Sequence, residues 1–276
     1  MKRILILLLI ITAATGCSST KDHESGDAAK NETTDNTQTQ LLIKKFKPIV
    51  HGYWIRKDYI EKIMQTRSVL AANDLVDAAE IEINTDEIKG DSLNVPVGDN
   101  HETGNSTLKF IPGKRPLTLV FNGQDLSYST KKGDTTIRLA FSDDKQKGFV
   151  FYTYIRAYKK LDKDFADILE EYLANRLVAG DYRLLGNDKS AGGVHFDKNG
   201  NISGFPDFDR YIIEYDLNSD VNDNLDVIHC FGHVNAQMDF TFKISDDTLK
   251  LYNTRENADS SRLITGDLKY QFVRQR

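Results

Sequence analysis

The chain has 276 residues, with 36 Lys and Arg against 41 Asp and Glu, a formal net charge of −5 at pH 7. This balance argues against a general binder of nucleic acid or of anionic membrane surfaces, since both need a basic surface. The only two cysteines are Cys17 and Cys230. If Cys17 is modified, no internal disulfide is possible, and the fold must be held by its own core.

The first sixteen residues have the pattern of an export signal. Lys2 and Arg3 precede the aliphatic run 4–11, and small residues lead to Cys17. The run is too short to span a bilayer core of about 30 Å as a helix, so residues 1–16 are predicted to be a targeting segment. Residues 14–17, Ala-Thr-Gly-Cys, resemble the lipobox of bacterial lipoproteins, which implies cleavage before Cys17 and a lipid anchor on it. An ordinary secretory signal is the alternative.

The segment after Cys17 is predicted to be a disordered tether, residues 17–44. Between residues 18 and 40 there is no aromatic side chain and no aliphatic one larger than alanine. Such a stretch cannot bury enough apolar surface to offset the entropy of ordering it. The charged run 21–24 is similar to export signals of Bacteroidetes lipoproteins, which implies a cell-envelope location, at the outer membrane, facing either the periplasm or the surface.

Within the globular body, apolar and polar residues alternate along several runs. In residues 237–244, Met238, Phe240 and Phe242 share one face of a strand. Asn122-Gly123 and Asn199-Gly200 are typical of type I′ hairpin turns. The pattern predicts an all-β fold, an antiparallel meander closed into one or two barrels, with a β-sandwich as the alternative.

Two amphipathic helices are predicted to interrupt the strands, over 58–72 and 162–178. Asp58 and Glu61 have the spacing of a capping box at the start of the first helix, and Gly180 follows the end of the second. The second helix divides the body into β-rich halves, 45–158 and 159–276. Each half has one helix and seven or eight possible strands, which raises the idea of a duplication.

Gly52-Tyr53-Trp54, at the start of a predicted strand, resembles the Gly-x-Trp signature of lipocalins and other calycins. The resemblance implies a barrel whose base is closed by Trp54 around a pocket for an apolar ligand. Gly180-Asp181-Tyr182 and the hairpin after it are similar to lipocalin-like domains of Bacteroidetes lipoproteins. The resemblance rests on these few residues.

Two segments carry residue types found in metal sites, but neither has the spacing that a metal site needs. On a strand, His229 and His233 stand about 13 Å apart, and Cys230 points to the opposite face, so the three cannot share one zinc ion. Residues 197–201 begin like a calcium loop, but the glycine is misplaced for an EF-hand, and a hairpin turn explains them more simply. No catalytic motif appears. The chain is predicted to be no enzyme, with no metal, no cofactor and no catalytic residue.

The remaining candidates are aromatic. Residues 149–155 are apolar on both faces, which is typical either of a two-sided core strand or of a strand with one face against a ligand. The candidate ligand-binding residues are Tyr53, Trp54, Phe151, Tyr152, Tyr154 and Tyr182. The predicted function is that of a lipid-anchored envelope protein binding a small apolar or amphipathic ligand. A protein or glycan interaction module and a secreted hydrolase are the alternatives, and the oligomeric state stays open.

Overall fold

In the computed structural model, the described residues are 27–99, 102–143, 148–186, 193–217, 224–232 and 237–275. Cys17 and the predicted export signal lie outside them. The chain divides into two units, Met1–Gln38 and Thr39–Arg276, and the description below concerns the second. Among the helices of the described ranges, none combines the length and the apolar character needed to cross a bilayer.

The first element is a helix, α1 (Asp27–Val50), which overlaps the expected tether of residues 17–44. Its last turns carry apolar residues at helical spacing: Leu42, Phe46 and Val50 follow one another every four residues. Phe46 and Val50 are fully buried in the core of the first barrel. Burial of this stripe stabilises the C-terminal turns of α1, and the helix continues from them back into the polar segment before residue 41.

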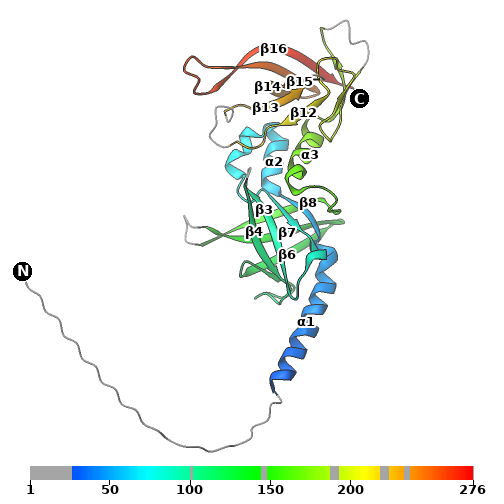
Figure 1. The fold of residues 1–276 in the computed structure, drawn as a ribbon, viewed down its shortest axis with the longest axis vertical. Helices are drawn as coiled ribbons and strands as arrows, with labels where there is room; N and C mark the ends of the chain where they lie inside the picture. Colours follow the sequence, from blue (N-terminus) through cyan, green and yellow to red (C-terminus); the bar gives the residue numbers. More distant parts are fainter. Residues whose placement is uncertain are drawn as a thin grey trace, which may run out of the picture. The chain divides into compact units, whose positions relative to one another are not determined.

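Eight strands form a closed antiparallel barrel in which each strand pairs with the next and the last pairs with the first (Figure 1). They are β1 (Gly52–Arg56), β2 (Glu80–Ile83), β3 (Ser92–Asp99), β4 (Glu102–Lys109), β5 (Leu119–Phe121), β6 (Gln124–Lys131), β7 (Asp134–Asp143) and β8 (Gly148–Tyr158). The up-and-down order confirms the predicted all-β meander and barrel, and the sandwich alternative is not adopted.

The core of the first barrel is formed by alternate residues of its strands. In β3, Leu93, Val95 and Val97 are buried and belong to one apolar cluster with residues of the other strands. Asn122 and Gly123 join β5 to β6 with positive φ angles of 47° and 75°. Two successive positive φ values are the requirement of a type I′ turn, as the sequence predicts.

The other eight strands form a second antiparallel sheet in the same sequential order. They are β9 (Gly180–Leu184), β10 (Val194–Phe196), β11 (Ile202–Ser203), β12 (Arg210–Ile213), β13 (Val227–Phe231), β14 (Gln237–Ser245), β15 (Thr248–Glu256) and β16 (Leu263–Arg274). β16 pairs with β9. Among the described residues, a short seam joins β11 to β12 at the bridge between Asn201 and Arg210. Its bonds run from Tyr211 N to Gly200 O and from Ile202 N to Asp209 O. The sheet is thus a nearly closed barrel.

The two predicted amphipathic helices are present with shifted ends. α2 (Lys57–Thr66) is followed by a 3₁₀ turn, η1 (Leu70–Leu75), and α3 (Phe165–Leu173) by a π turn, η3 (Ala174–Val178). A second 3₁₀ turn, η2 (Thr85–Glu87), lies in the first barrel. Asp164 caps α3 through its carboxylate, whereas Asp58 mainly binds Arg56.

The apolar faces of α2 and α3 share one core with the second barrel. Ile60 and Ile63 of α2 belong to the same buried cluster as Leu169 and Leu173 of α3 and Phe242 of β14. Figure 1 shows the two helices next to each other beside the strands of this sheet. Because one cluster covers both helices, the two halves of the folded body are joined through a shared apolar core.

Candidate functional site

The Gly-x-Trp residues lie at the base of the first barrel. Gly52 has a φ of 137°, and a Cβ there would come within 2.6 Å of the Tyr158 carbonyl oxygen, so only glycine fits. Trp54 is fully buried, and its Nε1 donates to the Val50 carbonyl oxygen over 2.8 Å. The Arg156 guanidinium lies 4.5 Å from the indole centroid. A base closed in this way is consistent with a calycin-like barrel.

The base of the second barrel repeats this arrangement. Gly180 has a φ of 154°, and the Tyr182 hydroxyl donates to the Val178 carbonyl oxygen over 2.7 Å. The Arg274 guanidinium lies 5.0 Å from the Tyr182 ring and donates to the Ala179 carbonyl oxygen over 2.9 Å. In both barrels a glycine, an aromatic residue two positions on and an arginine of the last strand close the base.

The six candidate ligand-binding residues do not form one pocket. Trp54, Tyr152 and Tyr154 line the interior of the first barrel, where the Tyr154 hydroxyl donates to the Ala78 carbonyl oxygen over 2.9 Å. Tyr182 belongs to the second barrel.

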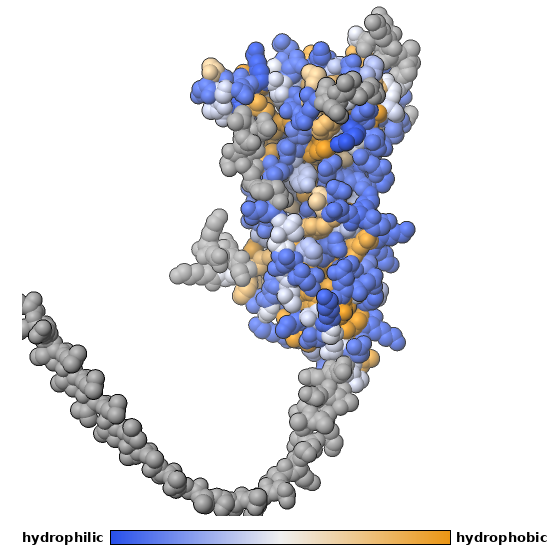
Figure 2. Space-filling model, viewed as in Figure 1, coloured by the Kyte–Doolittle hydropathy of each residue, from blue (hydrophilic) through white to orange (hydrophobic). Residues whose placement is uncertain are grey.

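Tyr53 and Phe151 point out of the first barrel. The Tyr53 ring stacks on Phe165 of α3, with 6.4 Å between centroids, and its hydroxyl donates to the Lys163 carbonyl oxygen. Phe151 is 45% exposed, with the Arg138 guanidinium 4.6 Å from its ring. Phe149 beside it is also exposed, and the face in Figure 2 has such apolar residues scattered among hydrophilic ones.

Packed side chains occupy the interior of both barrels. In the first barrel, Ile81, Leu108 and Leu139 are fully buried in one cluster with Trp54. In the second barrel the β11–β12 connection contributes Phe205 and Phe208, which pack against the ring of Tyr270. Tyr270 also donates to the Asp207 carboxylate over 2.9 Å. In the second barrel, the chain's own aromatic residues therefore take up the space that an apolar ligand would use.

A polar cavity of about 360 Å³ lies at the seam of the second barrel. α3 forms one wall, and the β10–β11 turn and β12 form the other. Its lining residues are Asp167, Glu170, Glu171, Ala174, Lys198, Asn199, Gly200, Arg210, Tyr211 and Ile212.

The charges of the seam cavity are opposed across it. On α3, burial raises the pKa of the Glu170 carboxyl, and the negative charge of Asp167 raises it further. The Arg210 guanidinium on β12 partly offsets this rise. Arg210 lies 5.0 Å from the Phe231 ring and forms no ion pair among the residues that the structure describes. The cavity thus presents carboxylates on one side and, on the other, a guanidinium that forms no direct ion pair with the described residues.

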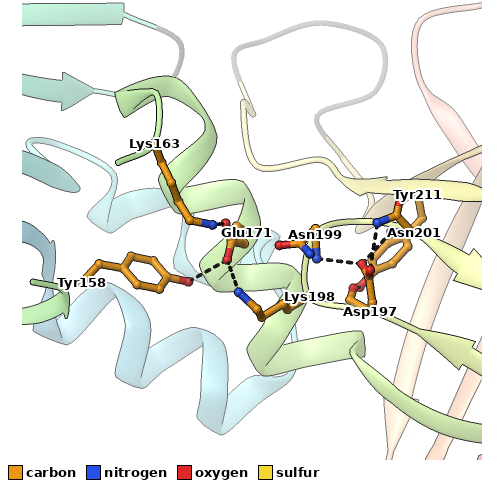
Figure 3. Close-up of polar contacts among 8 residues, drawn as sticks. All are labelled: Tyr158, Lys163, Glu171, Asp197, Lys198, Asn199, Asn201 and Tyr211. Carbon is orange, nitrogen blue, oxygen red and sulfur yellow. Dashed lines mark hydrogen bonds and ion pairs between the residues drawn. The ribbon is translucent and has the colours of Figure 1, made fainter. Parts of the chain in front are cut away.

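Glu171 holds the cavity walls together (Figure 3). Its buried carboxylate accepts from Lys198 Nζ over 2.9 Å and from the Tyr158 hydroxyl over 3.4 Å, and it pairs with Lys163. Lys198 comes from the β10–β11 turn, Tyr158 from β8 and Lys163 from the segment before α3. One carboxylate therefore connects the two barrels and fixes the turn against α3.

The β10–β11 connection is a hairpin turn and not a calcium loop. Asp197 Oδ1 accepts from the backbone N–H groups of Asn199 and Asn201, each over 2.8 Å, as Figure 3 shows in part. The Asp197 carboxylate is committed to the chain's own donors.

His229 lies between two carboxylates on the outer face of β13. Its Nε2 is 2.9 Å from Glu214 Oε2, and its Nδ1 is 2.7 Å from Asp239 Oδ1. Cys230 points to the core, where burial raises the pKa of its thiol to about 12. Within the described ranges no cluster of His, Cys, Asp and Glu has metal-binding geometry, and His233 lies outside them.

Sequence reasoning missed Arg156, Arg210, Glu171 and Arg274. The two base arginines had a signal: each ends a run with aromatic residues two and four positions earlier, 152–156 and 270–274. Arg210 and Glu171 had none, because their roles depend on which segments meet in space. Comparison with family models, curated proteins and solved structures finds no match for this chain.

Proposed function

We propose that the protein is a lipid-anchored binding protein of the cell envelope that holds a small zwitterionic or amphipathic ligand by its charged end. The proposed site is the seam cavity of the second barrel. The observation that carries the proposal is the opposition of Asp167 and Glu170 to Arg210 across a cavity of about 360 Å³. This volume is within the range of small-molecule sites, roughly 300–1,000 Å³.

The two walls suit two different groups of one ligand. An ammonium group can pair with the carboxylates of α3, while a carboxylate or phosphate group can receive the fork of Arg210 donors. The partial burial of Glu170 strengthens such a pairing, because a charge interaction gains as water is excluded. A ligand with a single charge would satisfy only one wall.

Binding fits the cavity better than catalysis. The Tyr211 hydroxyl donates to the Asp197 carbonyl oxygen over 2.7 Å, and burial raises its pKa, so it is not activated as a nucleophile or base. Lys198 is paired with Glu171. Tyr211 and Lys198 are thus engaged in holding the walls.

The lipid anchor on Cys17 and the envelope location remain part of the proposal. They are supported by the charged, aliphatic and small-residue order of residues 1–16. The resemblance of residues 14–17 to a lipobox supports the acylated cysteine.

Calorimetric titration of the mature chain tests the site. Phosphoethanolamine and glycine serve as zwitterionic probes, with ethylamine and acetate as singly charged controls. We expect binding of a zwitterion, and at least about tenfold weaker binding for Arg210→Gln and for Glu170→Gln, since each removes a charge-assisted hydrogen bond. Arg255→Gln, an exposed arginine of β15, is the matched control. Equal affinity in all variants, or no binding of either zwitterion, would contradict the proposal.

An apolar ligand inside the first barrel is the second candidate. It is favoured by the half-buried ring pair of Phe141 and Tyr152, whose centroids lie 5.5 Å apart inside the barrel wall. Titration with cis-parinaric acid tests it, because binding in the barrel would quench Trp54 by energy transfer. Unchanged Trp54 emission at saturating probe would exclude this site.

A further inference from the structure

We propose that a second cavity, beside the base of the second barrel, binds a small oxyanion such as phosphate or a carboxylate. The cavity has a volume of about 230 Å³ and lies where the end of α2 meets η3, β16 and the β14–β15 turn. It is lined by Arg67, Arg176, Leu177, Tyr182, Ile244, Asp246, Asp247, Thr248, Leu249 and Arg274.

Two of its three arginines have no counter-ion. Arg67 is the C-cap residue of α2, with a φ of 57°, and its backbone N–H donates to the Ile63 carbonyl oxygen over 2.7 Å. Arg176 lies in η3, with its guanidinium 5.3 Å from the Tyr172 ring. In the part of the chain that the structure describes, neither guanidinium forms an ion pair or a side-chain hydrogen bond. Both side chains are exposed, so their guanidinium donors are accessible to a ligand.

The third arginine is held in place. Arg274 donates from Nη1 to the Ala179 carbonyl oxygen over 2.9 Å and from Nη2 to the Tyr182 hydroxyl over 2.6 Å. These bonds fix its positive charge beside the cavity before any ligand arrives. A charge that needs no reorganisation on binding contributes more to affinity than a mobile one.

The acidic lining residues lie on the β14–β15 turn. Asp246 has a φ of 50°, and the Asp247 carbonyl oxygen accepts from Arg274 N over 2.7 Å. Three guanidinium groups thus face two carboxylates, which leaves an excess of one positive charge in the lining.

The chemistry favours an oxyanion over other ligands. Guanidinium groups match the planar, two-oxygen edge of a carboxylate or phosphate, which they bind through paired donors. The hydroxyl of Thr248 adds a further donor to the lining.

The test is thermal unfolding of the mature chain in potassium phosphate and in potassium chloride at equal ionic strength. A ligand that binds only the folded state raises the unfolding midpoint. We expect phosphate to raise the midpoint of the wild type by a few degrees over chloride. The shift should disappear in Arg67→Gln and in Arg176→Gln, and it should persist in the control Arg255→Gln.

The variant Asp246→Asn gives a test of opposite sign. It removes a negative charge from the lining, and asparagine accepts a positive φ, so the phosphate shift should grow. No shift in the wild type, or an equal shift in all five proteins, would overturn the proposal. None of these substitutions touches the seam cavity, so the result is independent of zwitterion binding there.

Discussion

Trp54 Nε1 donates to the carbonyl oxygen of Val50, the last residue of α1, over 2.8 Å. The same relationship holds in the second barrel, where the Tyr182 hydroxyl donates to the Val178 carbonyl oxygen over 2.7 Å. In each barrel an aromatic side chain thus returns to the carbonyl four residues earlier and satisfies the end of the preceding helical turn. One side chain thus links the first strand of each barrel to the end of the helical segment before it.

Replacement of Trp54 should destabilise the protein strongly. The indole is fully buried, and a core Trp→Ala change costs about 3–5 kcal/mol. Trp54→Phe keeps most of the apolar volume but loses the bond to Val50, so a smaller loss is expected. Chemical denaturation measures both. The wild-type fluorescence should be blue-shifted and poorly quenched by acrylamide, and an emission typical of solvated indole would contradict the burial.

Glu80→Gln should stabilise the protein, and more so at alkaline pH. Glu80 is buried without a partner for Oε2, and burial raises its pKa to about 8. Its folded pKa lies above the unfolded value of 4.5, so wild-type stability falls as pH rises from about 4.5 to 8. At pH 8 the gain on substitution should approach about 3 kcal/mol, and at pH 4 it should nearly vanish. A pH-independent difference between the two proteins would argue against a buried, neutral Glu80.

His229 should stabilise the fold below neutral pH. The hydrogen bond to Glu214 raises its pKa, with burial opposing and Asp239 adding to the rise. A raised folded pKa means that the contribution is complete below the unfolded value of 6.5 and is lost as pH rises through the folded value. Urea unfolding of wild type and His229→Gln should therefore show a larger stability gap at pH 6 than at pH 9. A stability difference that grows toward pH 9 would contradict a raised pKa for His229.

Cys17→Ala should release the mature protein from the membrane fraction, provided that its signal is still removed. The proposed lipid anchor depends on this cysteine, and stable attachment needs more than one acyl chain. Cell fractionation with an antibody to the folded body measures the distribution. Cys230→Ala is the matched control, because the buried thiol has no role in anchoring. Equal membrane retention of wild type and Cys17→Ala would rule out the anchor.

The barrels could be predicted from sequence because they depend on local patterns. Alternation in β3 and β7 gives the buried faces, and Asn122-Gly123 gives the turn. In β14 the alternation is only partly correct, because Phe240 and Phe242 are buried as predicted, whereas Met238 is exposed and Thr241 is buried. The α1 helix was missed because its apolar stripe begins only at the end of a long polar segment. The ends of α2 and α3 differ from the predicted ones because tertiary packing decides where an amphipathic helix ends.

Two short residue patterns recur at corresponding places in the two barrels, as the idea of a duplication would predict. Residues 49–54 and 177–182 share an aliphatic residue, valine, glycine and a final aromatic residue at the same spacing. Residues 152–156 and 270–274 share tyrosine, an aromatic residue, a β-branched residue and arginine. Segments 49–54 and 152–156 lie at the base of the first barrel, and segments 177–182 and 270–274 lie at the base of the second. The seam cavity has no such signature, since its walls come from segments far apart in the chain.

The link from α1 to Trp54 has a mechanical consequence. α1 ends at Val50 and β1 begins two residues later, at Gly52. Two contacts hold the end of α1: the hydrogen bond from Trp54 to Val50 and the contact of Arg156 with the Ile49 carbonyl oxygen. A force applied along α1 therefore acts first on these two contacts. Both contacts lie at the base of the first barrel, so the force reaches them before it can separate β1 from β2 or β8. The base of the first barrel is thus the part of the folded body that first resists a force applied to the helix.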